Sequence, residues 1–372
     1  MIRRLIAMVA LAASGLAAAQ GVTDTAIVLG QSVALTGPAK QLGLDMQQGA
    51  SLYFNLVNER GGVNGRKIAL KTLDDGYESA RAAENTKKLI NEEKVFALFG
   101  YVGTPTSAAS LPIFTEAKVP FVGPFTGAEL LRNPFNRYIF NVRASYFDET
   151  EAIVQHLTAM SINRIAVFYQ NDAYGQAGLA GVERALKKRN LEVIVKGTVE
   201  RNTVDVAKSV ADIRKANPQA VVMISAYTSC AAFIREMKKA GANPTFWNVS
   251  FVGSKALAKE LDREGRGVQI SQVMPFPWDS SIPVVKEFQK LAGPAKVEVG
   301  WGTLEGYVAA KVMVEGLRRA GRGLTREGFI KAMETMNPYD TGGFRVEFTP
   351  ESHNGSKWVD LTIISRDQKF VR

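Results

Sequence analysis

Residue types that usually perform catalysis are scarce in this sequence. Among 372 residues there are two histidines, His156 and His353, and one cysteine, Cys230. No pair of them has the spacing of zinc ligands. The sequence has no G-x-S-x-G motif, no P-loop, and no G-x-G-x-x-G that opens a helix after a strand. It therefore predicts a protein that is not an enzyme, with no catalytic residue, no metal site and no cofactor.

Three loops rich in glycine and hydroxyl side chains point to binding instead. They span residues 30–38, 100–106 and 123–129, and each follows a short apolar run. Thr104 precedes a proline, which is typical of a helix start. The free N–H groups of a helix N-terminus favour a carboxylate or another anion. The loops are therefore either ordinary helix caps or, if they converge on one sheet edge, parts of an anion-binding site.

Short apolar runs alternate with amphipathic segments along the chain. The apolar runs predict strands that are buried on both faces of a parallel sheet. They span residues 26–29, 95–99, 119–122, 165–169, 191–195 and 220–224. Between them, apolar residues recur at steps of three and four, which predicts helices with one buried face. This alternation predicts an α/β fold with doubly wound parallel sheets, whose ligands bind at the carboxyl ends of the strands.

Six segments resemble, in order and spacing, the leucine/isoleucine/valine-binding protein family of ABC importers. They are SVALTGPAKQLG (32–43), LDDG (73–76), GYVGTPTSAAS (100–110), VPFVGPFTGAELL (119–131), FYQNDAYG (168–175) and LEGYVAAK (304–311). The resemblance covers essentially the whole mature chain. It implies the type I periplasmic binding fold, in which two doubly wound parallel-sheet lobes, joined by a three-crossover hinge, close on a small ligand.

The length of the mature chain also favours two lobes, since it exceeds one ordinary core. The regular alternation is interrupted after residue 124 and again at 272–278 and 339–343, where the chain would cross between lobes. We expect residues 20–143 plus 275–345 to form the first lobe. Residues 144–274 plus 346–372 would form the second.

The resemblance also implies a set of ligand-binding residues. Thr104 and Thr126, with the backbone of two neighbouring residues, match positions that hold a carboxylate. Aromatic side chains from the second lobe match positions that close over the ligand, and Tyr146 joins them because of its expected place beside the hinge. The candidate ligand-binding residues are Leu42, Val102, Thr104, Phe125, Thr126, Tyr146, Tyr174, Tyr227 and Ser250.

Ser250 departs from the family pattern. Amino-acid binders of this family place an acid on the second lobe, against the ligand ammonium, and Ser250 matches that position. A buried ammonium without a carboxylate partner is costly. Either another acid such as Asp172 or Glu305 takes this role, or the ligand is an organic acid without the ammonium. We expect such an acid to bind at least as well as leucine, isoleucine or valine.

The first residues predict export. Arg3 and Arg4 precede an apolar run, and three alanines then lead to Gln20, which is the order of a cleaved signal peptide over residues 1–19. A buried N-terminal helix is the alternative. The only cysteine lies far downstream, so none can accept a lipid after cleavage. We expect a periplasmic protein without stable membrane insertion.

These features favour the substrate-binding component of an ABC importer for a small carboxylate-bearing solute, either an amino acid or an aromatic or aliphatic organic acid. Its partners would be that ligand and an inner-membrane ABC permease. The net charge of +10 is attributed to solvated helix surfaces, and an exported chain is not expected to bind nucleic acid. We expect a monomer. The alternative is a periplasmic sensory binding module that feeds a receptor or regulator, because the two uses share one fold.

Overall fold

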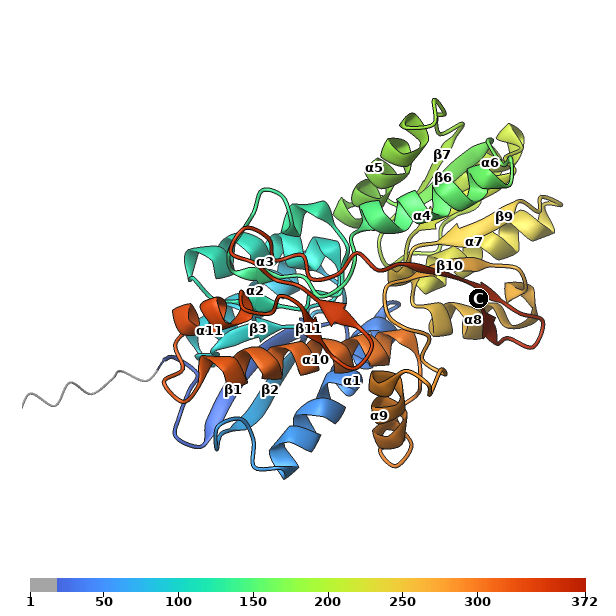
Figure 1. The fold of residues 1–372 in the computed structure, drawn as a ribbon. Helices are drawn as coiled ribbons and strands as arrows, with labels where there is room; N and C mark the ends of the chain where they lie inside the picture. The colour runs from blue at the N-terminus through green and yellow to red at the C-terminus, as the bar shows by residue number, and fades with distance from the viewer. Residues whose placement is uncertain (1–18) are drawn as a thin grey trace, which may run out of the picture.

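A computed structural model describes residues 19–372 and shows two α/β lobes side by side (Figure 1). The predicted signal peptide lies, apart from Ala19, outside the described residues. The first lobe is built on a parallel sheet in the order β2-β1-β3-β4-β5. Its strands are β1 (Ala26–Val33), β2 (Lys67–Asp74), β3 (Ala97–Phe99), β4 (Phe121–Val122) and β5 (Ile139–Phe140).

Helices cover both faces of this sheet, because successive strand residues point to opposite sides. Leu98 and Phe121 belong to an apolar cluster shared with α2 (Ser79–Asn91) and α3 (Thr104–Glu116). Their neighbours Phe99 and Val122 belong to the cluster shared with α1 and α10. The remaining helices and strands of this part are α1 (Lys40–Glu59), α9 (Pro283–Ala292), α10 (Trp301–Ala320), α11 (Arg326–Met333), β11 (Tyr339–Asp340) and β12 (Arg345–Val346).

The second lobe has a seven-stranded sheet in the order β14-β13-β10-β9-β8-β6-β7. Five of its strands are parallel, while β13 and β14, from the end of the chain, add an antiparallel edge. The strands are β6 (Ile165–Gln170), β7 (Lys196–Val199), β8 (Ala220–Ile224), β9 (Thr245–Asn248), β10 (Gln269–Gln272), β13 (Asp360–Ile364) and β14 (Phe370–Val371). The helices are α4 (Tyr146–Ala159), α5 (Ala173–Lys187), α6 (Ala207–Ala216), α7 (Tyr227–Lys239) and α8 (Ser254–Leu261).

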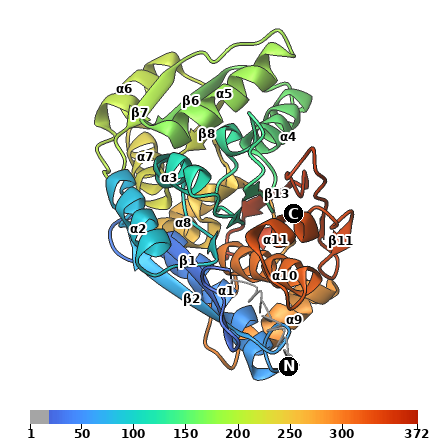
Figure 2. The ribbon, with the colours of Figure 1, turned by 90° about the vertical axis from the view of Figure 1, so that its left-hand side faces the viewer.

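Three segments carry the chain between the two sheets: β5 to α4, β10 to α9, and β12 to β13. Figure 2 shows the end of the chain returning past α10 and α11 to the second sheet. The predicted α/β fold with two parallel-sheet lobes is confirmed, and the exact residues that divide the lobes stay a prediction. Among residues 19–372, no helix is both long enough and apolar enough to cross a membrane.

One predicted strand fails, and several strands went undetected, among them the edge strands β2 and β5 and the interior strands β9 and β10. Residues 191–195 are irregular, and the strand follows them as β7. The edge strand β2 went undetected, because its side chains alternate between exposed and buried instead of forming one apolar run. Continuous apolar runs identify only strands with neighbours on both sides and helices on both faces, since edge strands keep one side in contact with water.

Candidate functional site

The loops after β3 and β4 meet at the carboxyl edge of the first sheet. A parallel bridge joins Val102 to Phe125. The hydroxyl oxygens of Thr104 and Thr126 lie 2.7 Å apart, and Thr126 donates a hydrogen bond to the Tyr146 hydroxyl at 3.2 Å. All five residues are buried. The structure thus brings together five of the nine candidate residues around one set of hydroxyls.

Two details of these loops differ from the sequence-based interpretation. The residue that caps α3 is Gly103, with φ +103°, and Thr104 makes no capping bond because its hydroxyl is turned to Thr126. In the loop after β1, the Thr36 hydroxyl and the Leu35 amide both donate to the Asp74 carboxylate, at 2.6 and 2.8 Å. The hydroxyl of this first loop therefore stabilises a turn, whereas the other two loops turn hydroxyls toward each other.

The second lobe contributes residues that begin helical segments. Tyr174, Tyr227 and Ser250 stand in the first turns after β6, β8 and β9, which places them at the carboxyl edge of that sheet. The Tyr174 ring lies 5.4 Å from the Tyr146 ring and 4.5 Å from Phe251. The Tyr227 hydroxyl accepts a long hydrogen bond, 3.5 Å, from the backbone of the first lobe. Tyr146 itself opens α4, which Ser145 and Asp148 cap reciprocally.

The two lobes are closed on each other. The cavity that remains between them has a volume of about 20 Å³, which is enough for roughly one water molecule. Leu42, Phe125 and Ser250 line it, and the other six candidates do not. Asp45 and Glu305 line it as well. A larger ligand can therefore enter only when the lobes separate.

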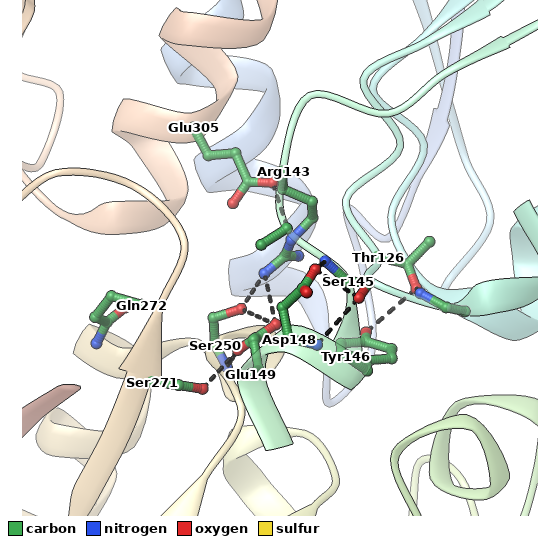
Figure 3. A network of polar contacts seen from close by, with 12 residues as sticks. Thr126, Arg143, Ser145, Tyr146, Asp148, Glu149, Ser250, Ser271, Gln272 and Glu305 are labelled. Carbon is green, nitrogen blue, oxygen red and sulfur yellow. Dashed lines mark hydrogen bonds and ion pairs between the residues drawn. The ribbon is translucent and has the colours of Figure 1, made fainter. Parts of the chain in front are cut away.

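A cluster of buried charges joins the lobes at the hinge (Figure 3). The Arg143 guanidinium lies 3.8 Å from a Glu149 oxygen and 3.5 Å from a Glu305 oxygen. Ser250 contacts Arg143 through its hydroxyl and donates to Glu149 from its backbone N–H, at 2.7 Å, and from its hydroxyl, at 3.0 Å. Ser271 donates to the same carboxylate at 2.6 Å. Ser250 is therefore hydrogen-bonded to a buried acid.

Of the two acids that the sequence left open as ammonium partners, only Glu305 reaches the cleft. Burial raises the pKa of Glu305 to about 7, against the lowering effect of Arg143. Asp172 instead caps α5, accepting hydrogen bonds from the backbone of Tyr174 at 2.9 Å and of Gly175 at 3.4 Å. Its other carboxylate oxygen accepts a hydrogen bond from Gln170 at 2.6 Å and lies 3.4 Å from Arg201.

Arg143 is the residue of this site that the sequence analysis missed. Its side chain is fully buried, and its Nε and Nη1 atoms have no hydrogen-bond partner among residues 19–372. Burial lowers the pKa of Arg143, but Glu305 and Glu149 raise it more, so the guanidinium stays charged. The Tyr174 hydroxyl likewise has no partner among those residues. An arginine in an irregular stretch gives no signal in sequence, since most arginines are exposed.

The rim of the closed cleft carries a second set of contacts between the lobes. Arg201, after β7, pairs with Glu78, before α2, at 3.0 Å. The side-chain amide of Asn202 donates to the Gly76 carbonyl at 3.1 Å and to Glu78 at 2.7 Å. These bonds can form only when the lobes are closed, so they stabilise the closed state relative to the open one.

Arg201→Ala is expected to weaken ligand binding by up to about fivefold, because the Arg201–Glu78 pair is partly exposed and such pairs contribute about 0.2–1 kcal/mol. Titration calorimetry with the tightest-binding carboxylate would measure the change. Lys208→Ala, which breaks the exposed Lys208–Asp212 pair within α6, is the control and should leave the affinity unchanged. If Arg201→Ala binds the ligand as tightly as the natural protein and Lys208→Ala do, the rim contacts do not contribute to closure.

Comparisons with known proteins agree with this architecture. The chain is 23% identical to "Leu/Ile/Val-binding protein homolog 7" of Brucella abortus, over 96% of this chain and 95% of that protein. The structure of a possible leucine/isoleucine/valine-binding protein from Rhodopirellula baltica superimposes with a TM-score of 0.90 at 33% identity, covering 94% of this chain and 97% of that one. A solute-binding protein of an ABC transporter from R. palustris, solved with benzoate, has a TM-score of 0.83 at 20% identity, over 93% and 95%.

These relatives are described as binding proteins, in agreement with the prediction that the chain is not an enzyme. Residues 26–368, almost the whole described chain, match the family described as periplasmic binding protein. With two parallel-sheet lobes, three connecting segments and facing hydroxyls and aromatic rings at the closed cleft, this chain belongs to the periplasmic binding protein family, in its leucine/isoleucine/valine-binding branch.

Proposed function

We propose that this protein is the substrate-binding component of an ABC importer and captures a small carboxylate-bearing solute in the bacterial periplasm. The observation that carries the proposal is the buried guanidinium of Arg143 at the meeting point of the lobes. Its Nη1 atom has no hydrogen-bond partner among residues 19–372, and its Nε atom has only the ion pair with Glu305 at 3.5 Å. An unpaired donor in a dry site costs about 1–3 kcal/mol, and more when it is charged. A ligand carboxylate that accepts a charge-assisted hydrogen bond from Nη1 removes that cost.

Neighbouring hydroxyl groups would also bind the carboxylate end of the ligand. The hydroxyls of Thr104, Thr126 and Tyr146 form one chain, and the Tyr174 hydroxyl is a free donor beside it among the described residues. Phe125 and Phe251, 5.6 Å apart across the lobes, offer apolar rings for the body of the ligand. The proposed ligand therefore has one carboxylate and an apolar portion. The benzoate of the R. palustris protein is a molecule of this kind.

The proposed mechanism is lobe closure. The open form exposes both sheet edges, the ligand bridges them, and the closed form is favoured because the ligand contacts both lobes only there. The closed protein, released as a monomer after removal of residues 1–19, then docks on an inner-membrane ABC permease. Whether the ligand carries an ammonium depends on Glu305 and Asp45, the two acids that line the cavity.

A screen of refolded protein by melting temperature tests the ligand class. Leucine, isoleucine and valine should be compared with their analogues that lack the amino group, with benzoate, and with matched neutral amides and amines. A ligand at 100 times its dissociation constant stabilises the fold by about 2.7 kcal/mol, which is readily measured. We expect carboxylates to stabilise the protein and their neutral amides to have no effect. Stabilisation by amines or amides alone would contradict the proposal.

Thr126→Ala is expected to weaken binding of the carboxylate found in that screen by about 1–3 kcal/mol, because a hydrogen bond to a charged group is lost. Thr104→Ala should act similarly. The loss of the bond between the two threonines should cost only about 1 kcal/mol of folding stability. Thr158→Ala, which removes a hydroxyl bonded within α4, is the matched control and should bind normally. Normal affinity in both cleft variants would remove the threonines from the site.

A further inference from the structure

A second aromatic surface lies outside the cleft. It is a groove of about 750 Å³ between α8, the segment that follows β10, and strand β14. Phe276, Trp278 and Phe370 line it, and the Trp278 ring stacks parallel to the Phe370 ring at 5.7 Å while remaining 38% exposed. Its volume falls within the roughly 300–1,000 Å³ of small-molecule sites. An exposed tryptophan face in such a groove is suited to stacking with another flat ring.

Three ammonium groups surround these rings. Lys255 pairs with Glu298 at 2.8 Å and lies 6.0 Å from the centre of the Trp278 ring. Lys259 and Lys369 also line the groove, and neither has a carboxylate within 4 Å in the described part of the chain. The remaining acid of the groove, Asp262, accepts a hydrogen bond from Gln368. The groove therefore combines an apolar floor with two cations that lack a counterion.

We infer that this groove is a second binding site, and that it takes an aromatic carboxylate. The ring of the ligand would lie on Trp278, and its carboxylate would bind Lys259 and Lys369. A neutral aromatic compound would leave the two ammonium groups unpaired, and an anion without a ring would leave Trp278 exposed to water. Charge and shape together favour the aromatic anion.

This site is distinct from the cleft, although the two are close. Trp301 lines the cleft cavity and packs edge-on against Trp278 at 5.2 Å and against Phe276 at 5.6 Å. Its ring thus stands between the two spaces. The groove lies on the outer side and is open to solvent in the closed conformation, so it does not need lobe separation to be filled.

The test is fluorine NMR of protein labelled with 5-fluorotryptophan, titrated with biphenyl-4-carboxylate. The four tryptophans give separate signals, which single Trp→Phe variants assign. We expect the Trp278 signal to shift with saturation below about 1 mM, while that of Trp247, buried in the second lobe, stays fixed. The double variant Lys259→Ala, Lys369→Ala should weaken this effect about tenfold or more, and biphenyl-4-methanol should produce a much smaller shift. Both lysines are exposed, so the variant should fold normally.

Binding of the same probe in the cleft would be separated from binding in the groove by Thr126→Ala. That variant should keep the Trp278 response. An unchanged Trp278 signal up to about 5 mM would overturn the inference. So would a Trp278 response that the lysine double variant retains in full, or one that Thr126→Ala abolishes. The first two outcomes do not bear on the cleft as a carboxylate site, and the third would support it.

Discussion

Arg143→Met is expected to lower the free energy of unfolding by about 3–5 kcal/mol and to abolish carboxylate binding. The substitution leaves Glu149 and Glu305 buried without their cation, and buried charges that lose a partner are among the most costly defects in a fold. Urea denaturation followed by circular dichroism would measure the loss of stability. Titration with the ligand from the screen, below the melting temperature of the variant, would measure the loss of binding.

Arg137→Met is the matched control for this result. Arg137 also pairs with a glutamate, Glu327, at 2.8 and 2.9 Å, but both side chains are largely exposed, so the expected loss is at most about 1 kcal/mol. The triple variant Arg143→Met, Glu149→Gln, Glu305→Gln should regain part of the stability, because no buried charge is then left without a partner. It should not regain carboxylate binding. If Arg143→Met costs no more than Arg137→Met, the buried cluster is not an ionic one.

Glu305→Gln is expected to become more stable relative to the natural protein as the pH rises. The pKa of Glu305 is about 7 in the folded protein against an ordinary value of 4.5, so the folded state binds this proton more tightly than the unfolded state. The stability of the natural protein therefore falls through this group as the pH rises from about 4.5 to about 7. Two and a half pKa units correspond to about 3 kcal/mol, and glutamine does not titrate.

Urea denaturation of both proteins at pH 5 and pH 8 would measure this difference. Asp45 and Asp75, whose pKa values burial raises to about 6, titrate in both proteins and cancel in the comparison. Glu327→Gln should show no comparable change between pH 5 and pH 8. Arg137 lowers the pKa of Glu327 below its ordinary 4.5, so this carboxylate is largely ionised in both the folded and the unfolded state over that range. The difference in unfolding free energy between Glu305→Gln and the natural protein should change with pH. An equal difference at pH 5 and pH 8 would contradict a raised pKa for Glu305.

The sequence by itself determined the fold class and much of the first-lobe site. Continuous apolar runs located central strands such as β6 and β8, because strands covered on both faces must be apolar throughout. Glycine and threonine loops after β3 and β4 placed Thr104 and Thr126 at one sheet edge, where the structure sets their hydroxyls 2.7 Å apart. The carboxyl ends of parallel strands always meet at one edge, so loop composition indicated that these loops could converge, and the family resemblance singled out the two threonines.

The tertiary structure alone decided the electrostatics of the hinge. Arg143, Glu149, Ser250 and Glu305 come from three separate segments of the chain, and only the crossings between the lobes bring them together. Arg143 and Glu149 would be read as exposed residues from their neighbours in sequence, since charged side chains are rarely buried without partners. Whether a charge has a partner depends on contacts between distant segments, which local periodicity does not encode. The sequence therefore indicates where a ligand site lies, and the packing of the two lobes determines which charges face it.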